Sequence, residues 1–241
     1  MIPRIIHYCW FGNKKKPHLI RKCINSWKQI HPDWVVIEWN ESNYDVNKIP
    51  YIKEAYEKKK WAFVVDYARF DILNEYGGIF LDTDVELLKR IPDELLQHEA
   101  FTGFESIDKV APGLIYASIP KQKLLADIMN IYESKNFSLD ENIVSIVTGI
   151  LKSHGLRCNN TFQSIDGVAV YPSDFFCCYD FETQSFSITP ETISIHHYFA
   201  SWFPWYKKMY FKCIKYAAIV LGKERYMKLK RKLVKRAEEQ C

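Results

Sequence analysis

The sequence predicts an α/β protein with a mixed sheet flanked by helices, and three observations predict it. Short apolar runs alternate along the chain with segments of helical periodicity, which is the order of elements in an α/β domain. The 241 residues are 48% hydrophobic and 26% charged, as in a globular protein with a large core. No apolar run approaches the ~18 residues that a membrane-spanning helix needs.

The individual elements follow from apolar spacing and punctuating residues. The clearest helix lies in the segment that starts at Lys58, where apolar side chains recur at helical spacing from Trp61 to Tyr76 and Gly77 is placed to end it. Residues 78–85 then form a short apolar run ending in acids, which predicts a buried strand with polar side chains at its edge. The remaining elements are strands over 2–10, 34–39, 101–105, 168–171 and 192–197, and helices over 17–30, 121–132 and 142–152.

The positive charge of the chain is concentrated at its C-terminus. Residues 205–241 hold twelve Lys/Arg and three Glu, a balance of +9, whereas residues 1–204 carry a balance of −5. The sequence therefore predicts an α/β domain over 1–204 and a basic amphipathic helical tail over 205–241. Aromatic residues interleave with lysines in this tail, a composition typical of helices that lie on anionic membrane surfaces.

Three further expectations concern location and partners. The N-terminus lacks the apolar core of a signal peptide, and seven cysteines without a Cys-x-x-Cys spacing indicate free thiols, so we expect a cytoplasmic protein. A cytoplasmic protein with a basic, membrane-binding tail is expected to lie peripherally on the inner face of the membrane. Nucleic acid is not expected as a partner, because the basic residues are confined to a tail beside an acidic body.

The sharpest short motif is Asp82-Thr83-Asp84. On an extended strand, residues two apart point to the same side, which would put the two carboxylates roughly 6–7 Å apart at ~3.3 Å rise per residue. Two such carboxylates repel one another unless a cation lies between them, and a divalent cation carrying a diphosphate is a common partner. Mg²⁺ or Mn²⁺ is therefore expected at Asp82 and Asp84.

Two further segments carry candidate site residues. Asp66 and Arg69 are three residues apart on the predicted helix and share one face, so they either form an ion pair or contact a ligand, Arg69 a phosphate and Asp66 a sugar hydroxyl. Near residue 197, an imidazole, a hydroxyl and an indole offer one metal ligand and two diphosphate contacts. Because adjacent residues on a strand point to opposite sides, only one of His196 and His197 can join the site, and we favour His197, with Ser201 and Trp202.

These motifs resemble the Asp-x-Asp sugar-transferase family, glycosyltransferase family 32, which includes bacterial capsular polysaccharide glycosyltransferases and the fungal initiating outer-chain mannosyltransferase. The resemblance covers residues 1 to about 204 and is carried by the N-terminal strand through Trp10 and Gly12, by 26–33, 62–69 and 76–84, and by His197 with Ser201-Trp202. It implies a GT-A fold, a nucleotide-sugar donor, a divalent metal and retaining transfer.

More distantly the chain is similar to the glucosylating bacterial toxins. That resemblance implies that Trp10 stacks on the donor base, that Asp66 and Arg69 contact the donor sugar and ribose, and that Asp84 binds the metal. The function expected is hexose transfer from a UDP-sugar, with a GDP-sugar as the second choice, to a glycan acceptor in capsule or other surface polysaccharide synthesis. A lipid-linked acceptor at the membrane fits the basic tail.

Two other classes compete with this interpretation. A haloacid-dehalogenase-like phosphatase also has an apolar strand followed by Asp-x-Asp, but its motif usually opens the domain, and Glu86 stands here where it has Thr or Val. A non-catalytic sugar-binding protein would not need Asp66, Arg69, Asp82, Asp84 and His197 together.

Overall fold

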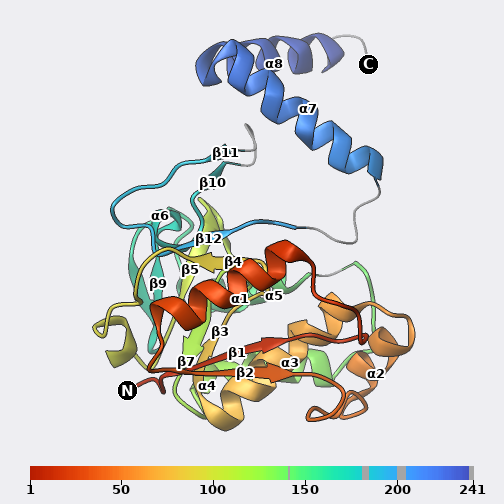
Figure 1. The fold of residues 1–241 in the computed structure, drawn as a ribbon, viewed down its shortest axis with the longest axis vertical. Coiled ribbons are helices and arrows are strands. Elements are labelled where there is room, and N and C mark those ends of the chain that lie inside the picture. Colours follow the sequence, from red (N-terminus) through yellow and green to blue (C-terminus); the bar gives the residue numbers. More distant parts are fainter. Residues whose placement is uncertain (141, 181–184, 200–204, 239–241) are drawn as a thin grey trace. The chain divides into compact units, whose positions relative to one another are not determined.

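A mixed β-sheet forms the centre of the larger part of the chain (Figure 1). The computed structural model describes residues 1–140, 142–180, 185–199 and 205–238. The sheet strands are β1 (Ile5–Cys9), β2 (Val35–Trp39), β3 (Gly78–Phe80), β5 (Ala100–Ser106), β6 (Lys109–Val110), β7 (Tyr116–Ser118), β8 (Gln163–Ile165) and β9 (Val168–Tyr171). Their order is β2-β1-β3-β7-β5-β9-β8, with β6 paired to β5.

The sheet is parallel at one side and mixed at the other. β1 pairs in parallel with both β2 and β3, and β5 pairs in parallel with β9, whereas β7 runs antiparallel to β3 and β5. A side chain at Gly78 would lie 2.8 Å from the carbonyl oxygen of Ile5, and its φ of +98° suits glycine, so this residue lets β3 approach β1. The carboxyl ends of β1 and β3 consequently lie next to each other.

Helices cover this sheet. They are α1 (His18–Ile30), α2 (Pro50–Glu57), α3 (Trp61–Tyr76), α4 (Lys123–Glu133), α5 (Ile143–Ser153), the short α6 (Ser173–Phe176) and the 3-10 turn η1 (Leu95–Gln97). α3 packs on β1, β3 and β7, while α2 and α4 pack against α3. α3 ends where Gly77, at φ +64°, donates its N–H to the carbonyl of Leu73 at 2.8 Å.

A second ladder has two strands and includes β4 (Val85–Leu87), the strand that follows β3 in the sequence. It pairs β4 antiparallel with β12 (Ser194–His196), and places His196 opposite Val85. α1 packs against β4, and the Trp27 indole of α1 donates to the Val85 carbonyl at 2.8 Å. This buried contact fixes the start of β4.

The chain divides into two compact units, residues 1–177 with 190–197 and residues 178–189 with 198–241. Within the second unit, β10 (Tyr179–Asp180) pairs with β11 (Ser185–Phe186), and α7 (Trp205–Leu221) contacts α8 (Lys223–Glu238). Gly222 joins these two helices at φ +75°. The predicted domain boundary at residue 204 lies outside the described residues and stays a prediction.

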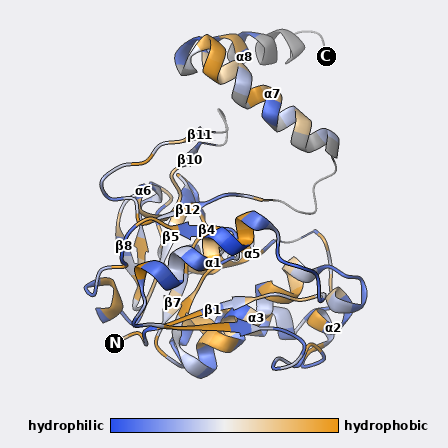
Figure 2. Cartoon of the chain, viewed as in Figure 1, coloured by the Kyte–Doolittle hydropathy of each residue, from blue (hydrophilic) through white to orange (hydrophobic). Residues whose placement is uncertain are grey.

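The predicted fold class is confirmed: an α/β protein with a mixed sheet flanked by helices and a basic helical tail. The tail consists of two helices, along which hydrophobic and hydrophilic residues interchange (Figure 2). One local prediction was wrong. The strand predicted over 78–85 ends at Phe80, and β4 starts only at Val85, so Asp82-Thr83-Asp84 lies between two strands.

Candidate active site

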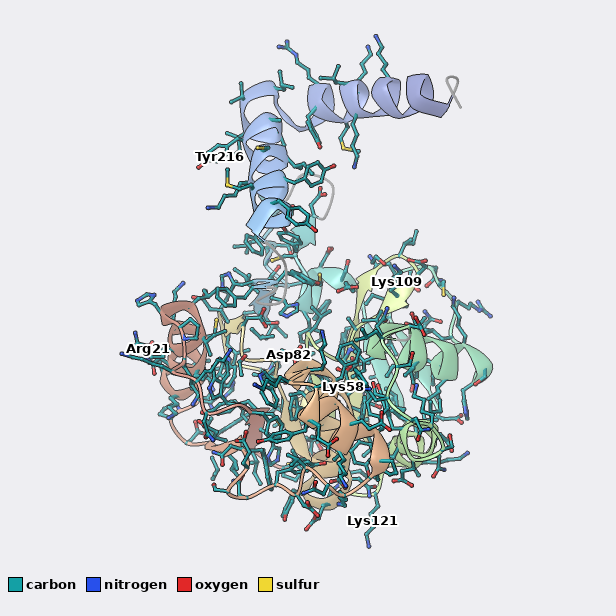
Figure 3. All side chains as sticks on the ribbon, turned by 90° about the vertical axis from the view of Figure 1, so that its right-hand side faces the viewer. Arg21, Lys58, Asp82, Lys109, Lys121 and Tyr216 are labelled. Carbon is teal, nitrogen blue, oxygen red and sulfur yellow. The ribbon has the colours of Figure 1, made fainter. Side chains whose placement is uncertain are left out.

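A tight turn at the carboxyl end of β3 carries both aspartates. The Leu81 N–H still donates to the carbonyl of His7 on β1, at 3.1 Å, and the turn is then closed by the Val85 N–H donating to the Asp82 carbonyl at 3.0 Å. This turn replaces the extended geometry predicted for the motif. The two acids share one site because the chain reverses between them, and Figure 3 places Asp82 inside the body of the first unit.

A histidine joins the two carboxylates. One ligand atom each from Asp82, Asp84 and His196 lies within 4.8 Å of the others, and His196 Nε2 lies 3.0 Å from Asp84 Oδ1. The side chains of Asp84 and His196 are 15% and 13% exposed, and that of Asp82 is 28% exposed. The cluster is thus largely shielded from bulk water, with Asp82 at its open side.

The choice between the two histidines differs from the sequence expectation, which favoured His197. The His197 ring lies 2.8 Å from Glu86, a carboxylate that also pairs with Lys22. Neighbouring residues on a strand point to opposite faces, and the pairing of β12 with β4 turns His196 toward Asp84. His196 therefore takes the place in the site that the sequence analysis gave to His197.

Arg69 reaches this site from α3. Its side chain is 2% exposed, its Nη2 donates to Asp82 Oδ1 at 2.7 Å, and its guanidinium lies 4.9 Å from the centre of the Phe80 ring. Arg69 Nε and Nη1 are buried without a hydrogen-bond partner. Buried donors without an acceptor are costly, by about 1–3 kcal/mol or more for a charged group. The N–H groups of these two nitrogens are therefore available to donate hydrogen bonds to an anionic ligand beside the carboxylates.

The electrostatics of the site show crowded negative charge. Burial raises the pKa of the half-buried Asp66 to about 7, the Asp82 carboxylate acts in the same direction, and Arg69 opposes both. Burial also raises the pKa of Asp82 against the influence of Arg69. For His196, burial lowers the pKa, but the Asp84 carboxylate outweighs burial and the net shift is upward. The pKa is raised for all three groups, so each of them keeps a proton to a higher pH than it would in water.

The residues present fit a divalent cation. Two carboxylates and one imidazole form a mixed oxygen and nitrogen set, which suits Mn²⁺ and also admits Mg²⁺ with water completing the shell. A dipositive charge would also favour the ionised forms of Asp66 and Asp82, whose pKa values burial raises. Arg69 donates to the Asp82 carboxylate through Nη2 and keeps Nε and Nη1 unpartnered, so a cation and an anion could be held side by side.

Trp10, predicted to stack on a base, lies in the loop after β1. It is half-buried, its indole N–H donates to the Lys14 carbonyl at 2.6 Å, and the Lys16 ammonium lies 5.5 Å from its ring centre. This ring is therefore held by its loop and is not part of the core. Ser201 and Trp202, the other predicted donor contacts, lie outside the described residues.

The fold and this site together define a class: an α/β protein with a carboxylate cluster and a buried arginine at the carboxyl ends of parallel strands, where such sheets bind ligands. Residues 17–102 match the family model described as "Glycosyltransferase sugar-binding region containing DXD motif". The match confirms the resemblance predicted from the sequence, and the Asp82-Thr83-Asp84 motif lies inside the matched residues. It favours a sugar transferase over the phosphatase alternative.

Curated relatives carry related names. The chain is 30% identical over 136 residues to the mannosyl phosphorylinositol ceramide synthase CSH1 of Saccharomyces cerevisiae, covering 54% of this chain and 35% of that protein. It is 33% identical over 111 residues to the uncharacterized glycosyltransferase L373 of Acanthamoeba polyphaga mimivirus, covering 44% of each. The chain thus spans less than half the length of these relatives.

Among solved structures, the PaToxG glycosyltransferase aligns with a TM-score of 0.48 at 15% identity, covering 63% of this chain and 68% of that one. A glycosyltransferase involved in glycosylation of the major capsid of PBCV-1 aligns with a TM-score of 0.46 at 11% identity, covering 80% and 93%.

Proposed function

We propose that this chain is a metal-dependent, retaining hexosyltransferase with a GT-A type fold that uses a nucleotide-sugar donor. The observation that carries the proposal is the joint placement of the Asp82–Asp84–His196 cluster and the unpartnered nitrogens of Arg69, with the motif inside the family-matched segment. UDP-sugars are the favoured donors and GDP-sugars the second choice. The acceptor is a glycan.

Different side chains would contribute to different parts of the cleavage of a glycosyl–diphosphate bond. A divalent cation held by Asp82, Asp84 and His196 would stabilise the negative charge that develops on the leaving diphosphate. Arg69 adds two donor nitrogens, Nε and Nη1, from a nearly water-free position, where electrostatic stabilisation is strongest. Asp66, with a pKa of about 7, exchanges hydrogen bonds with a sugar hydroxyl as either donor or acceptor.

Other parts of the donor would be bound by three residues predicted from the sequence, Trp10, Ser201 and Trp202. The Trp10 ring stacks on the base from the loop after β1, and Ser201 and Trp202 contact the diphosphate. Two relatives are named as inositol phosphoceramide mannosyltransferases, of Schizosaccharomyces pombe, which puts mannose donors among those to test and supports an acceptor carried by a lipid. A role in capsule or other surface polysaccharide synthesis belongs to the same proposal.

We expect the purified protein to hydrolyse one donor from a panel of UDP- and GDP-sugars slowly, in the presence of Mn²⁺. EDTA is expected to abolish this activity and added Mn²⁺ or Mg²⁺ to restore it, because the carboxylates alone would repel a diphosphate. Released nucleotide is measured by chromatography. A thermal shift with a donor but no turnover would indicate a non-catalytic sugar-binding protein, and cleavage of simple phosphate monoesters would indicate a phosphatase.

We also propose that the tail, residues 205–241, binds the protein to the inner, cytoplasmic face of a membrane. Among the described residues, no helix combines the length and hydropathy needed to cross a bilayer. Large apolar side chains nevertheless face solvent on α7: Tyr216 is 66% exposed and Val220 80% exposed, and Figure 3 shows Tyr216 projecting outward from that helix. Apolar side chains here alternate with basic residues that give the tail a charge balance of +9, and this combination fits the headgroup region of an anionic bilayer.

Vesicle co-sedimentation tests this location. Reversing three exposed tail charges, with Lys212→Glu, Lys228→Glu and Lys232→Glu, is expected to weaken binding to anionic vesicles roughly a hundredfold or more, at ~1 kcal/mol per charge lost. The matched control reverses three exposed lysines of the first unit, Lys109, Lys121 and Lys152. Equal loss in both variants, or binding that survives 1 M salt, would contradict docking by the tail.

A further inference from the structure

A tight turn that no motif singled out lies against the Asp82 carboxylate. Ala111 to Leu114 form this turn, which is closed by the Leu114 N–H donating to the Ala111 carbonyl at 3.1 Å. Pro112 and Gly113 occupy its two central positions. Gly113 is not among the residues with positive φ, so its backbone conformation is one that other residues adopt. The backbone therefore does not explain a glycine here.

The space around Gly113 does explain it. A Cβ at this position would lie 2.5 Å from Asp82 Oδ2 and 3.7 Å from Arg69 Nη1. A carbon and a carboxylate oxygen cannot approach to 2.5 Å, so any side chain here would require one of the two groups to move. The absence of a side chain at Gly113 is what leaves room for the Asp82 carboxylate in its observed position.

The neighbours of this carboxylate determine what would move. Arg69 is 2% exposed and lies on the Phe80 ring, so it is held in place, whereas the Asp82 side chain is 28% exposed, so a collision would displace Asp82 by rotation of its side chain. Such a rotation would break the 2.7 Å bond to Arg69 and take the carboxylate away from Asp84 and His196.

We propose that Gly113 is a positioning residue for the candidate metal site. Its missing side chain forms a slot that holds the Asp82 carboxylate between Arg69 and the Asp84–His196 pair. Gly113 lies outside the family-matched segment, residues 17–102. The inference rests on the proposed function, because positioning matters only if Asp82 serves as a ligand.

The test is Mn²⁺ binding by the Gly113→Ala variant, measured by electron paramagnetic resonance of the free ion and by calorimetry. We expect the dissociation constant for Mn²⁺ to rise at least tenfold. In the donor-hydrolysis assay, the Mn²⁺ concentration for half-maximal rate is expected to rise in parallel, and saturating Mn²⁺ to recover part of kcat. A general weakening of the fold would not produce this split between metal affinity and maximal rate.

A matched control uses a glycine in β5. A Cβ at Gly103 would lie 2.7 Å from the Phe176 ring, a collision of similar severity but inside the core. Gly103→Ala is expected to lower the melting temperature and to leave the Mn²⁺ dissociation constant unchanged. Loss of Mn²⁺ affinity in Gly103→Ala equal to that in Gly113→Ala would mean that packing changes anywhere in this sheet disturb the site, and would overturn the specific role.

Thermal melting of a double variant keeps the proposal testable if Gly113→Ala folds poorly. If the added methyl collides with the Asp82 carboxylate, Asp82→Ala should relieve it, and the double variant should melt at the temperature of Asp82→Ala alone. A double variant that stays destabilised overturns the proposal. Wild-type protein that binds Mn²⁺ with the same constant as Gly113→Ala overturns the positioning role alone, whereas wild-type protein that binds no Mn²⁺ overturns the proposed function as well.

Discussion

Replacing Asp84 by alanine is expected to abolish sugar transfer while the protein remains folded. Asp84 contributes one of the two carboxylates of the cluster and lies 3.0 Å from the His196 ring. Without it, the cation loses a ligand and the diphosphate loses its neutralising partner. Removal of one preorganised electrostatic contact at a reacting centre costs about 10²–10³-fold in rate, and loss of the metal adds to this, so we expect at least a thousandfold loss in kcat/KM.

The control for this prediction is Glu86→Ala. Glu86 is the next acidic residue along the chain, on β4, but its carboxylate pairs with His197 and Lys22 outside the cluster. Donor hydrolysis by Glu86→Ala is expected to stay near the wild-type rate, with circular dichroism confirming that both variants are folded. Wild-type turnover by Asp84→Ala in Mn²⁺ buffer would refute the assignment of the site.

Replacing Arg69 by alanine is expected to reduce both stability and activity. The variant removes the cation from beside Asp82 and leaves a buried space next to the Phe80 ring. Loss of one partner of a buried ion pair costs about 3–5 kcal/mol, and because Asp82 is 28% exposed we expect a smaller loss of about 2–3 kcal/mol in urea denaturation. Donor hydrolysis should fall at least a hundredfold, since both unpartnered nitrogens are lost.

The loss of stability in Arg69→Ala is expected to be larger at high pH than at low pH. Arg69 lowers the pKa of both Asp66 and Asp82, so its favourable contribution exists only where these carboxyls are ionised. The stability difference between wild type and Arg69→Ala should be largest above pH 7 and should shrink as the pH falls through the Asp66 pKa of about 7 and below.

Arg90→Ala serves as the control, because Arg90 is 54% exposed and pairs with the exposed Asp33. An exposed pair of this kind contributes little to stability because water screens it, and the variant should retain full activity. A loss in Arg90→Ala as large as that in Arg69→Ala would show that the effect does not arise at the candidate site.

Local sequence signals predicted the elements that local interactions build. The helix predicted in the segment from Lys58 to Gly77 is α3, because its apolar spacing and the glycine at its end are both read within one segment. The short strands β6, β7 and β8 have two or three residues each, which is too few for a periodic pattern. The position of β7 depends on pairing with β3, a distant segment of the chain, and β6 and β8 are fixed by short hairpins with β5 and β9 instead of by an apolar pattern of their own.

The candidate site also combines residues that local motifs predict with contacts that only the folded chain creates. The acids at 82 and 84 and the arginine at 69 could be chosen from their motifs, whereas the turn that brings the acids together could not, because a strand pattern and a strand followed by a turn look alike over four residues. The choice of His196 over His197 depends on the register between β12 and β4. Gly113 carried no signal of a role in the site, since a Pro-Gly pair is typical of any surface turn.

The ladder between β4 and β12 makes the candidate site a composite of distant parts of the chain. Asp84 and His196 are 112 residues apart in sequence, and they meet only when the 190–197 segment has docked on β4. A ligand that binds only the assembled cluster adds its binding free energy to the docking of that segment. Docking of β12 and loading of the cluster are therefore thermodynamically linked, so an undocked β12 would leave the cluster without its third ligand, and a loaded cluster would hold β12 in place.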